Sequence, residues 1–418
     1  MTAFSVSPGR PLRGRVRVPG DKSISHRALM LGALAEGVSR VRGLSDGGDV
    51  RRTRAAVQAL GATAEGERIT GGRRRLHEPA DVIDVGNSGT TIRLLAGLCA
   101  GFDWLTVLTG DDSIRRRPMQ RVAEPLRAMG AEVEGRTGML PPLVVRGGGL
   151  KGMTCELAVP SAQVKSAVLL AALSAAGDTV VVQRPRTRAH TEEMLVLAGA
   201  DVVLSDDGCT VTVKPGDLHP FELDVPGDPS QAAFWLVAAG LVPGSEVVAE
   251  NVYLGPARDG FVHVLERMGL HVEQVGERDL RATYAGRLRA TQVRPEEVPG
   301  LIDEIPVLAV VAAVAEGTTV FEGVEELRVK ESDRMAAISS QLSAMGAEVE
   351  LEADRLIVHG RDGGLRGAPV DAGGDHRMAM ALAVAALAAT EGDTTVEGWE
   401  SVATSYPGFE DDLRELLG

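Results

Sequence analysis

The sequence predicts a two-domain α/β protein in which one unit of helices and strands is repeated six times. Each copy begins with a loop of polar and small residues, continues into a helix rich in Ala, Leu and Val, and turns at glycine into a short β-branched strand. This alternation indicates mixed sheets around buried helices. The copies open 65, 74, 67, 76 and 71 residues apart, at Asp21, Gly86, Pro160, Gly227, Asp303 and Gly374.

Chain length and repeat number predict where the domains divide. A chain of 418 residues exceeds what one hydrophobic core usually supports, and six copies divide into three and three. The sixth copy ends at its second helix, so the extended amino-terminal segment is expected to supply its closing strand. We therefore expect an inserted domain over residues 20–226 and a discontinuous domain over 1–19 and 227–418. The cleft between them is the expected site.

Composition excludes several classes of function. The net charge of −14 opposes nucleic-acid binding, and an aromatic content of 3% gives few stacking platforms. Three separated cysteines without histidines at ligand spacing predict neither a disulfide framework nor a zinc site. No signal sequence begins the chain, and its longest apolar run, residues 305–315, is too short to span a bilayer. We expect a monomeric cytoplasmic protein that does not bind membranes.

Polar loops at the helix starts of the first two copies are candidate binding elements. Lys22, Ser23 and Arg27 lie where the first apolar helix begins, a place where free N–H groups favour anions. The second loop contains Gly89, whose small size would let a ligand approach the backbone, and Arg117 follows in an arginine-rich turn. Simple helix capping explains each of these loops equally well when it is taken alone.

The remaining copies carry further polar loops. The third contains Ser161, Ala162 and Gln163, and Arg188 lies downstream of it. The fifth places Asp303 at a helix start, and residues 330–334 (Lys-Glu-Ser-Asp-Arg) are predicted to open another helix with Lys330 and Arg334 on one face. An intrahelical salt bridge is the alternative interpretation of that charged run. His376 and Arg377 open the last helix.

Taken together, these loops predict a positively charged site in an acidic protein. Such a site suits small polyanions, for example phosphorylated carboxylates. Asp303 and Glu331 lie among the cations and are candidates for general acid and base. The cations concerned are Lys22, Arg27, Arg117, Arg188, Lys330, Arg334 and Arg377.

Six motifs together resemble the 5-enolpyruvylshikimate-3-phosphate synthase family of enolpyruvyl transferases. In chain order they are GDKSISHR, GNSGTTIRL, RRRPM, PSAQVKSA, VKESDR and DHRMAM. The resemblance covers essentially the whole chain and implies two domains of three βαβαββ units each, an inverse α/β barrel, with the active site in the cleft. It implies that shikimate 3-phosphate and phosphoenolpyruvate react with release of phosphate, in aromatic amino acid biosynthesis. No metal or organic cofactor is implied.

The resemblance also implies a role for each matching residue. Asp303 would accept the proton of the attacking hydroxyl, and Glu331 would protonate the methylene carbon and later take a proton back. Lys22, Lys330 and His376 complete the implied catalytic set. Shikimate 3-phosphate would be held by Lys22, Ser23, Arg27, Ser161, Ala162, Gln163, Arg188, Asp303 and Lys330. Phosphoenolpyruvate would be held by Lys22, Gly89, Arg117, Gln163, Arg334, His376 and Arg377.

The chain departs from the family pattern at a few positions. Thr404 stands where many members have Lys, and Glu326 where some have Asn. Arg188 replaces a Tyr and Ala162 replaces a second Ser of other branches. In the branch that this chain resembles, members that are insensitive to the herbicide glyphosate carry Ala at the position of Gly89. Glycine at this position leaves room for glyphosate, so we expect it to inhibit this chain.

Three alternative functions are weighed against this one. A UDP-N-acetylglucosamine enolpyruvyl transferase normally carries Cys in the loop over residues 109–121, and this chain has none there. A nucleotidyl transferase related to RNA 3′-phosphate cyclase would have a basic surface. A non-catalytic polyanion-binding scaffold would keep the cations but would not need Asp303 or Glu331.

Overall fold

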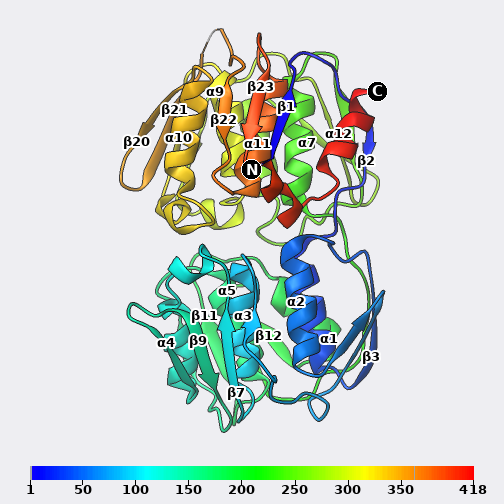
Figure 1. The fold of residues 1–418 in the computed structure, drawn as a ribbon, viewed down its shortest axis with the longest axis vertical. Helices are drawn as coiled ribbons and strands as arrows, with labels where there is room; N and C mark the ends of the chain where they lie inside the picture. The colour runs from blue at the N-terminus through cyan, green and yellow to red at the C-terminus, as the bar shows by residue number, and fades with distance from the viewer. Residues whose placement is uncertain (1, 362) are drawn as a thin grey trace. The chain divides into compact units, whose positions relative to one another are not determined.

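The computed structural model describes residues 2–361 and 363–418, and the chain divides into two compact units (Figure 1). The inserted unit is Gly20–Val225. The terminal unit combines Pro226–Gly418 with the segment that ends at Pro19, so both ends of the chain belong to it. Within the described ranges, no helix has the length and apolar character needed to cross a membrane.

The inserted unit contains three four-stranded sheets. Its strands are β3 (Gly37–Arg42), β4 (Thr63–Glu65), β5 (Arg68–Gly71), β6 (Ile83–Asp84), β7 (Leu105–Thr109), β8 (Glu132–Arg136), β9 (Leu140–Arg146), β10 (Thr154–Glu156), β11 (Thr179–Val182), β12 (Val202–Leu204), β13 (Thr210–Val213) and β14 (Glu222–Asp224). The sheet orders are β14-β3-β5-β4, β6-β7-β9-β8 and β10-β11-β13-β12. The last strand, β14, pairs in parallel with the first, with Glu222 opposite Arg40, so the third copy closes onto the first.

The terminal unit repeats this plan with strands from both ends of the chain. Its strands are β1 (Ala3–Val6), β2 (Arg13–Val16), β15 (Glu246–Ala249), β16 (Val272–Val275), β17 (Asp279–Thr283), β18 (Gln292–Val293), β19 (Thr318–Glu322), β20 (Glu348–Leu351), β21 (Arg355–His359), β22 (Pro369–Asp371) and β23 (Thr394–Glu397). The sheet orders are β1-β23-β22, β16-β17-β15-β2 and β18-β19-β21-β20. Strand β1 lies antiparallel to β23 (Figure 1), which confirms that the amino-terminal segment closes the sixth copy.

The first helix of each copy is buried on nearly all sides. Every residue of α11, for example, is buried. A helix that is apolar all round has no face suited to water, and this explains its position inside the sheets. These first helices are α1 (Lys22–Leu34), α3 (Gly89–Cys99), α5 (Ala162–Ala172), α7 (Pro229–Leu241), α9 (Ile305–Val314) and α11 (His376–Leu387).

The second helix of each copy buries fewer of its residues and is shorter or more polar. These helices are α2 (Gly48–Ala59), α4 (Gln120–Met129), α6 (His190–Leu197), α8 (Gly260–Met268), α10 (Arg334–Ala344) and α12 (Phe409–Leu417). Among the described residues, four 3₁₀ helices lie in the connections: η1 (Ile114–Arg116), η2 (Val298–Gly300), η3 (Glu325–Val329) and η4 (Trp399–Thr404). Phe409 of α12 stacks on Trp235 with ring centroids 4.4 Å apart, which docks the carboxy-terminal helix on the core.

Short side chains cap the first helices of five copies. The side chains of Asp21, Ser88, Ser161, Asp228 and Asp375 each accept a hydrogen bond from an N–H in the first turn that follows. Helix α9 follows Glu304 without such a bond and carries Pro306 in its first turn. Caps are therefore present in the polar loops before α1, α3 and α5, and the residues after each cap occupy first turns rich in free N–H groups.

Candidate active site

Helix α1 carries two of the predicted cations in different surroundings. The Nζ of Lys22 pairs with the Asp49 carboxylate of α2 at 3.1 Å, and both side chains are largely buried. Arg27 lies one turn later and donates from Nη1 to the carbonyl oxygen of Ser23 at 2.9 Å. The Asp49 carboxylate therefore helps to hold Lys22 at the helix start.

The guanidinium of Arg27 also joins three helices. Its Nε donates to the Thr191 hydroxyl of α6 at 2.6 Å, and its Nη2 donates to the Ser166 hydroxyl of α5 at 2.7 Å. These hydroxyls also bond one another at 2.6 Å. Arg27 is 3% exposed, so much of its hydrogen-bonding capacity is used inside the unit.

The start of α3 places glycine between two guanidinium groups. A Cβ on Gly89 would lie 2.8 Å from Nη1 of both Arg117 and Arg93. Arg93 also donates to the Gln163 side chain of α5 at 2.9 Å, and Gln163 donates to Thr90 at 3.0 Å. The structure therefore brings Gly89, Arg117 and Gln163 together, as the sequence predicted for one binding region.

Arg117 and Arg188 occupy corresponding connections in successive copies. Each lies between the strand that follows a first helix and the second helix of its copy. Arg117 donates to the Ser113 hydroxyl at 3.1 Å and to Asn87 at 3.3 Å. The main-chain oxygen of Arg188 accepts from Nζ of Lys165 in α5 at 2.9 Å. Ser161 caps that helix, and Ala162 is its first residue.

The terminal unit has a denser arrangement of charges centred on Arg334. Its Nε lies 2.8 Å from Asp375, its Nη2 lies 2.6 Å from Glu331, and its Nη1 lies 3.4 Å from Asp303. Arg334 is 1% exposed and Asp375 is fully buried, whereas Asp303 and Glu331 keep 18% and 19% of their side chains exposed. One buried cation thus holds the two predicted acid–base carboxylates next to one another.

Burial and charge act against each other in this cluster. Burial opposes the charge of Arg334, but Asp375 and Glu331 outweigh that effect and raise its pKa. Burial likewise opposes ionisation of Asp375, but Arg334 outweighs it and holds the pKa of this carboxyl below its usual value. Asp375 and Arg334 therefore form a buried ion pair in which both groups are favoured in their charged forms.

The prediction that residues 330–334 open a helix is wrong for the first three of them. Helix α10 begins at Arg334, and Asp333 caps it by accepting from the N–H of Ala336 at 3.0 Å. Lys330 and Glu331 precede that cap, so no helical face joins Lys330 to Arg334. The alternative interpretation, a salt bridge within one helix, does not describe Lys330 either. Its Nζ lies 3.9 Å from the distant Asp303 and 3.7 Å from Glu326, which precedes it by four residues in the connection before α10.

The last two predicted residues begin α11 beside the same cluster. Arg377 donates to the main-chain oxygen of Asp303 at 3.3 Å, and its Nη2 lies 3.9 Å from that carboxylate. His376 is 2% exposed at the first position of the helix. Thr404 ends η4 and is half-buried. All the charged residues predicted in this unit therefore meet around Asp303 and Arg334.

Sequence reasoning assigned no role to Asp375, Arg93 or Asp49. Asp375 lies in the recognised DHRMAM motif, but a helix cap and a buried counter-ion look the same in sequence. Arg93 lies one helical turn after Gly89, a spacing that places both on one face and could have identified it. Asp49 belongs to a polar helix without a distinctive motif, and only the fold brings it to Lys22.

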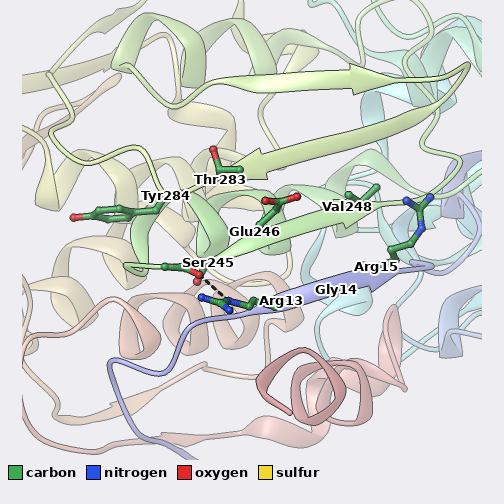
Figure 2. A pocket seen from close by; sticks show the side chains of 9 residues that line it. Arg13, Gly14, Arg15, Ser245, Glu246, Val248, Thr283 and Tyr284 are labelled. Atoms are coloured by element: carbon green, nitrogen blue, oxygen red, sulfur yellow. Dashed lines mark hydrogen bonds between the residues drawn. The ribbon is translucent and has the colours of Figure 1, made fainter.

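Other features of the described residues lie away from both clusters. A groove of about 670 Å³ on the sheet that contains β15 and β2 (Figure 2) includes none of the predicted site residues. Its lining includes Arg15, which already pairs with Glu250 at 2.5 Å. Glu348, Glu350 and His359 form the one group with metal-ligand geometry in the described part of the chain, and it is largely exposed on β20 and β21.

Comparison with solved structures identifies the class of this fold. The enolpyruvyl transferase NikO from Streptomyces tendae superposes with a TM-score of 0.78 at 20% identity, over 99% of this chain and 96% of that one. The EPSP synthase from Acinetobacter baumannii superposes with a TM-score of 0.85 at 38% identity, over 100% of this chain and 98% of that one. Two units of three repeats with buried first helices therefore define an enolpyruvyl transferase fold.

Sequence comparison narrows the class to one family. The family model for EPSP synthase (3-phosphoshikimate 1-carboxyvinyltransferase) matches residues 6–413. A 3-phosphoshikimate 1-carboxyvinyltransferase from Synechococcus sp. (strain JA-3-3Ab) is 51% identical over 99% of this chain and 96% of its own length. One from Pelotomaculum thermopropionicum is 48% identical over 99% of this chain and 98% of its own. The chain belongs to the EPSP synthase family.

Proposed function

We propose that this chain transfers the enolpyruvyl group of phosphoenolpyruvate to the 5-hydroxyl of shikimate 3-phosphate and releases inorganic phosphate. This is the step of the shikimate pathway that its family name describes, on the route to aromatic amino acids. Family membership supports the reaction class, and the geometry around Arg334 supports the assignment of the chemistry. The UDP-N-acetylglucosamine alternative is not favoured by the family match or by the relatives.

The reaction proceeds by addition and elimination. Asp303 takes the proton of the 5-hydroxyl while the oxygen of that hydroxyl bonds to C2 of phosphoenolpyruvate. Glu331 donates a proton to C3. In the second half Glu331 takes a proton back from C3, the C2–C3 double bond re-forms, and phosphate leaves from C2 with the proton that Asp303 had accepted. Because the alkene carbon is a poor base, the acid must be placed accurately, and fixed cations must hold the carboxylate and phosphate in line.

The single observation that carries this mechanism is that one buried guanidinium is shared by Asp375, Glu331 and Asp303. Asp375 is fully buried and stays bound to Nε, whereas the other two carboxylates are partly exposed. An incoming ligand carboxylate can take their place on the Nη atoms. Binding of phosphoenolpyruvate then frees Glu331 and Asp303 for proton transfer, so ligand capture and the acid–base chemistry are linked.

The binding roles divide by substrate. Arg334, His376 and Arg377 in the terminal unit, with Gly89, Arg117, Gln163 and Lys22 in the inserted unit, bind phosphoenolpyruvate. Lys22, Ser23, Arg27, Ser161, Ala162, Gln163, Arg188, Asp303 and Lys330 bind shikimate 3-phosphate. Arg27 acts partly by fixing Ser166 and Thr191. The protein is proposed to work as a cytoplasmic monomer without metal or cofactor.

Phosphate release from phosphoenolpyruvate tests the proposal. Purified protein should release phosphate when shikimate 3-phosphate is added and not when UDP-N-acetylglucosamine is added. Phosphate release that depends on the UDP sugar alone would show that the chain is a UDP-N-acetylglucosamine enolpyruvyl transferase instead. Silence with both acceptors, together with a correctly folded protein by circular dichroism, would refute an enolpyruvyl transfer of either kind.

A further inference from the structure

A buried ion pair in the inserted unit has no role in the mechanism above. Lys165 is the fourth residue of α5 and Glu192 is the third residue of α6, and their Nζ and Oε1 atoms lie 2.6 Å apart. Their side chains are 0% and 2% exposed. The same Nζ donates to the main-chain oxygen of Arg188 at 2.9 Å. One ammonium group therefore joins α5, α6 and the connection that precedes α6.

Fold stability alone does not explain this pair. Burial lowers the pKa of Lys165, and Glu192 opposes that change. Replacing a buried ion pair by apolar residues of similar volume often leaves stability unchanged or increases it, because desolvation of both charges is costly. A buried pair that the core does not need is a candidate for a role in positioning.

The other five copies show that the fold does not require a charge at this place. The fourth residue of the first helix is buried and apolar in four of them: Ile92, Ala232, Leu308 and Ala379. In α1 the corresponding residue is Ser25, whose hydroxyl accepts from the N–H of Ser45 at 3.0 Å. Ser45 lies between β3 and α2, and Arg188 lies in the matching connection between β11 and α6. A polar residue at this position therefore anchors that connection.

Lys165 anchors the connection that contains Arg188, on the helix that begins with Ala162 and Gln163. We propose that Lys165 is a positioning residue for shikimate 3-phosphate: it fixes the main chain of Arg188 relative to the start of α5, with Glu192 as its counter-charge. This inference rests on the proposed function, because Arg188 and the start of α5 are its shikimate 3-phosphate ligands. Arg27 supports the same segment through Thr191.

Replacing both charges by apolar residues tests the inference. Lys165→Met alone would leave a buried carboxylate without its cation, so the main variant is the double substitution Lys165→Met with Glu192→Met. We expect it to fold, to raise KM for shikimate 3-phosphate at least tenfold, and to change kcat and KM for phosphoenolpyruvate less than threefold. A merely structural role would not separate the two KM values. A KM for shikimate 3-phosphate within twofold of wild type would overturn the inference.

Two further measurements separate the explanations. In an Arg188→Ala background the double substitution should raise KM for shikimate 3-phosphate no further, since its effect passes through Arg188. A full additional tenfold rise there would contradict positioning through this residue. Lys214→Met, which breaks the exposed 2.7 Å pair with Asp201, is the matched control and should change neither KM. Wild-type protein without turnover would refute the proposed function itself, whereas an unchanged KM in the variant refutes only the role of Lys165.

Discussion

The site residues of the inserted unit and those of the terminal unit lie on copies of the same repeat, but their cations contact different kinds of side chain. In the inserted unit, Lys22 pairs with the Asp49 carboxylate of the neighbouring helix, and Arg27, Arg93 and Arg117 donate hydrogen bonds to hydroxyls, a side-chain amide and a main-chain carbonyl. In the terminal unit, Arg334 alone contacts three carboxylates. Carboxylates that share one cation provide groups that can move protons. We therefore predict that the acid–base chemistry depends on the terminal unit, whereas residues of both units contribute to substrate binding.

The comparison predicts its largest effect at Glu331. Glu331→Gln removes the acid without changing the size of the side chain, so kcat should fall by about 10³-fold, within the range known for general acids and bases. Steady-state phosphate release is the measurement. Glu325→Gln, which removes an exposed carboxylate of η3, is the control and should retain activity. A kcat within tenfold of wild type for Glu331→Gln would show that another residue acts as the general acid.

The next largest effect is expected at Asp375, the buried partner of Arg334. Asp375→Asn should lower kcat/KM for phosphoenolpyruvate by about 100-fold, and the free energy of unfolding by about 3 kcal/mol, since it breaks a buried ion pair from one side. Substrate kinetics and urea unfolding measure these effects. Asp333→Asn keeps a capping side chain on α10 and serves as the control. Equal losses in both variants would contradict a special role for the buried pair.

The pH dependence of stability provides a second test of Asp375. Its pKa in the folded protein lies below the unfolded value, so the unfolded state binds the proton more tightly. The stabilisation is then present above the unfolded pKa of about 4, and is lost as the pH falls through and below that value. Urea unfolding between pH 6 and pH 3 should show a smaller decrease for Asp375→Asn than for wild type. Parallel curves would contradict this assignment.

A moderate effect is expected at Gly89 in the inserted unit. In Gly89→Ala the new methyl group would displace Arg93 and Arg117, so KM for phosphoenolpyruvate should rise about tenfold, the equivalent of a modest overpacking cost. The wild-type enzyme should be inhibited by glyphosate and this variant less so, as dose–response curves at low phosphoenolpyruvate will show. Gly216→Ala is the control, because its Cβ would meet nothing within 4 Å. Wild-type turnover that is unaffected by millimolar glyphosate would contradict the expected sensitivity.

The smallest effect is expected at Asp49. Asp49→Asn keeps the shape of the partner of Lys22 but removes its charge. KM for both substrates should change only about threefold, because the amide oxygen can still accept the hydrogen bond from Lys22. The control is Asp84→Asn, which weakens the exposed 3.2 Å pair with Arg52. A hundredfold decrease in kcat for Asp49→Asn would contradict the comparison between the two units, because the chemical step would then depend on the inserted unit.

Much of this arrangement could be predicted from the sequence because the repeat is local. Asp21, Ser88 and Asp375 each stand before an apolar helix, so the first helices and their polar starts were evident. The closing strand β1 followed from a sixth copy that lacked one. The sequence did not predict that Lys330 lies outside the helix. Asp333 caps α10, but in the sequence a charged residue before a cap looks the same as one after it.

Other parts of the site depend on contacts between distant segments. The hydrogen bond from Lys165 to Arg188 joins residues 23 positions apart, and Arg334 meets Asp375 across 41 positions. No periodicity records such pairs. A lysine within an Ala- and Val-rich helix is expected at the surface, and only the fold shows that this one is buried beside Glu192. The sequence therefore indicated many of the site residues, and the structure shows which side chains fix their positions.

The most direct test of the division between binding and chemistry is calorimetric titration of shikimate 3-phosphate into Glu331→Gln and Arg188→Ala, with turnover measured on the same preparations. The account predicts that Glu331→Gln binds within threefold of wild type while its turnover is lost, and that Arg188→Ala binds at least tenfold more weakly. Loss of shikimate 3-phosphate binding in Glu331→Gln, or wild-type affinity in Arg188→Ala, would contradict it.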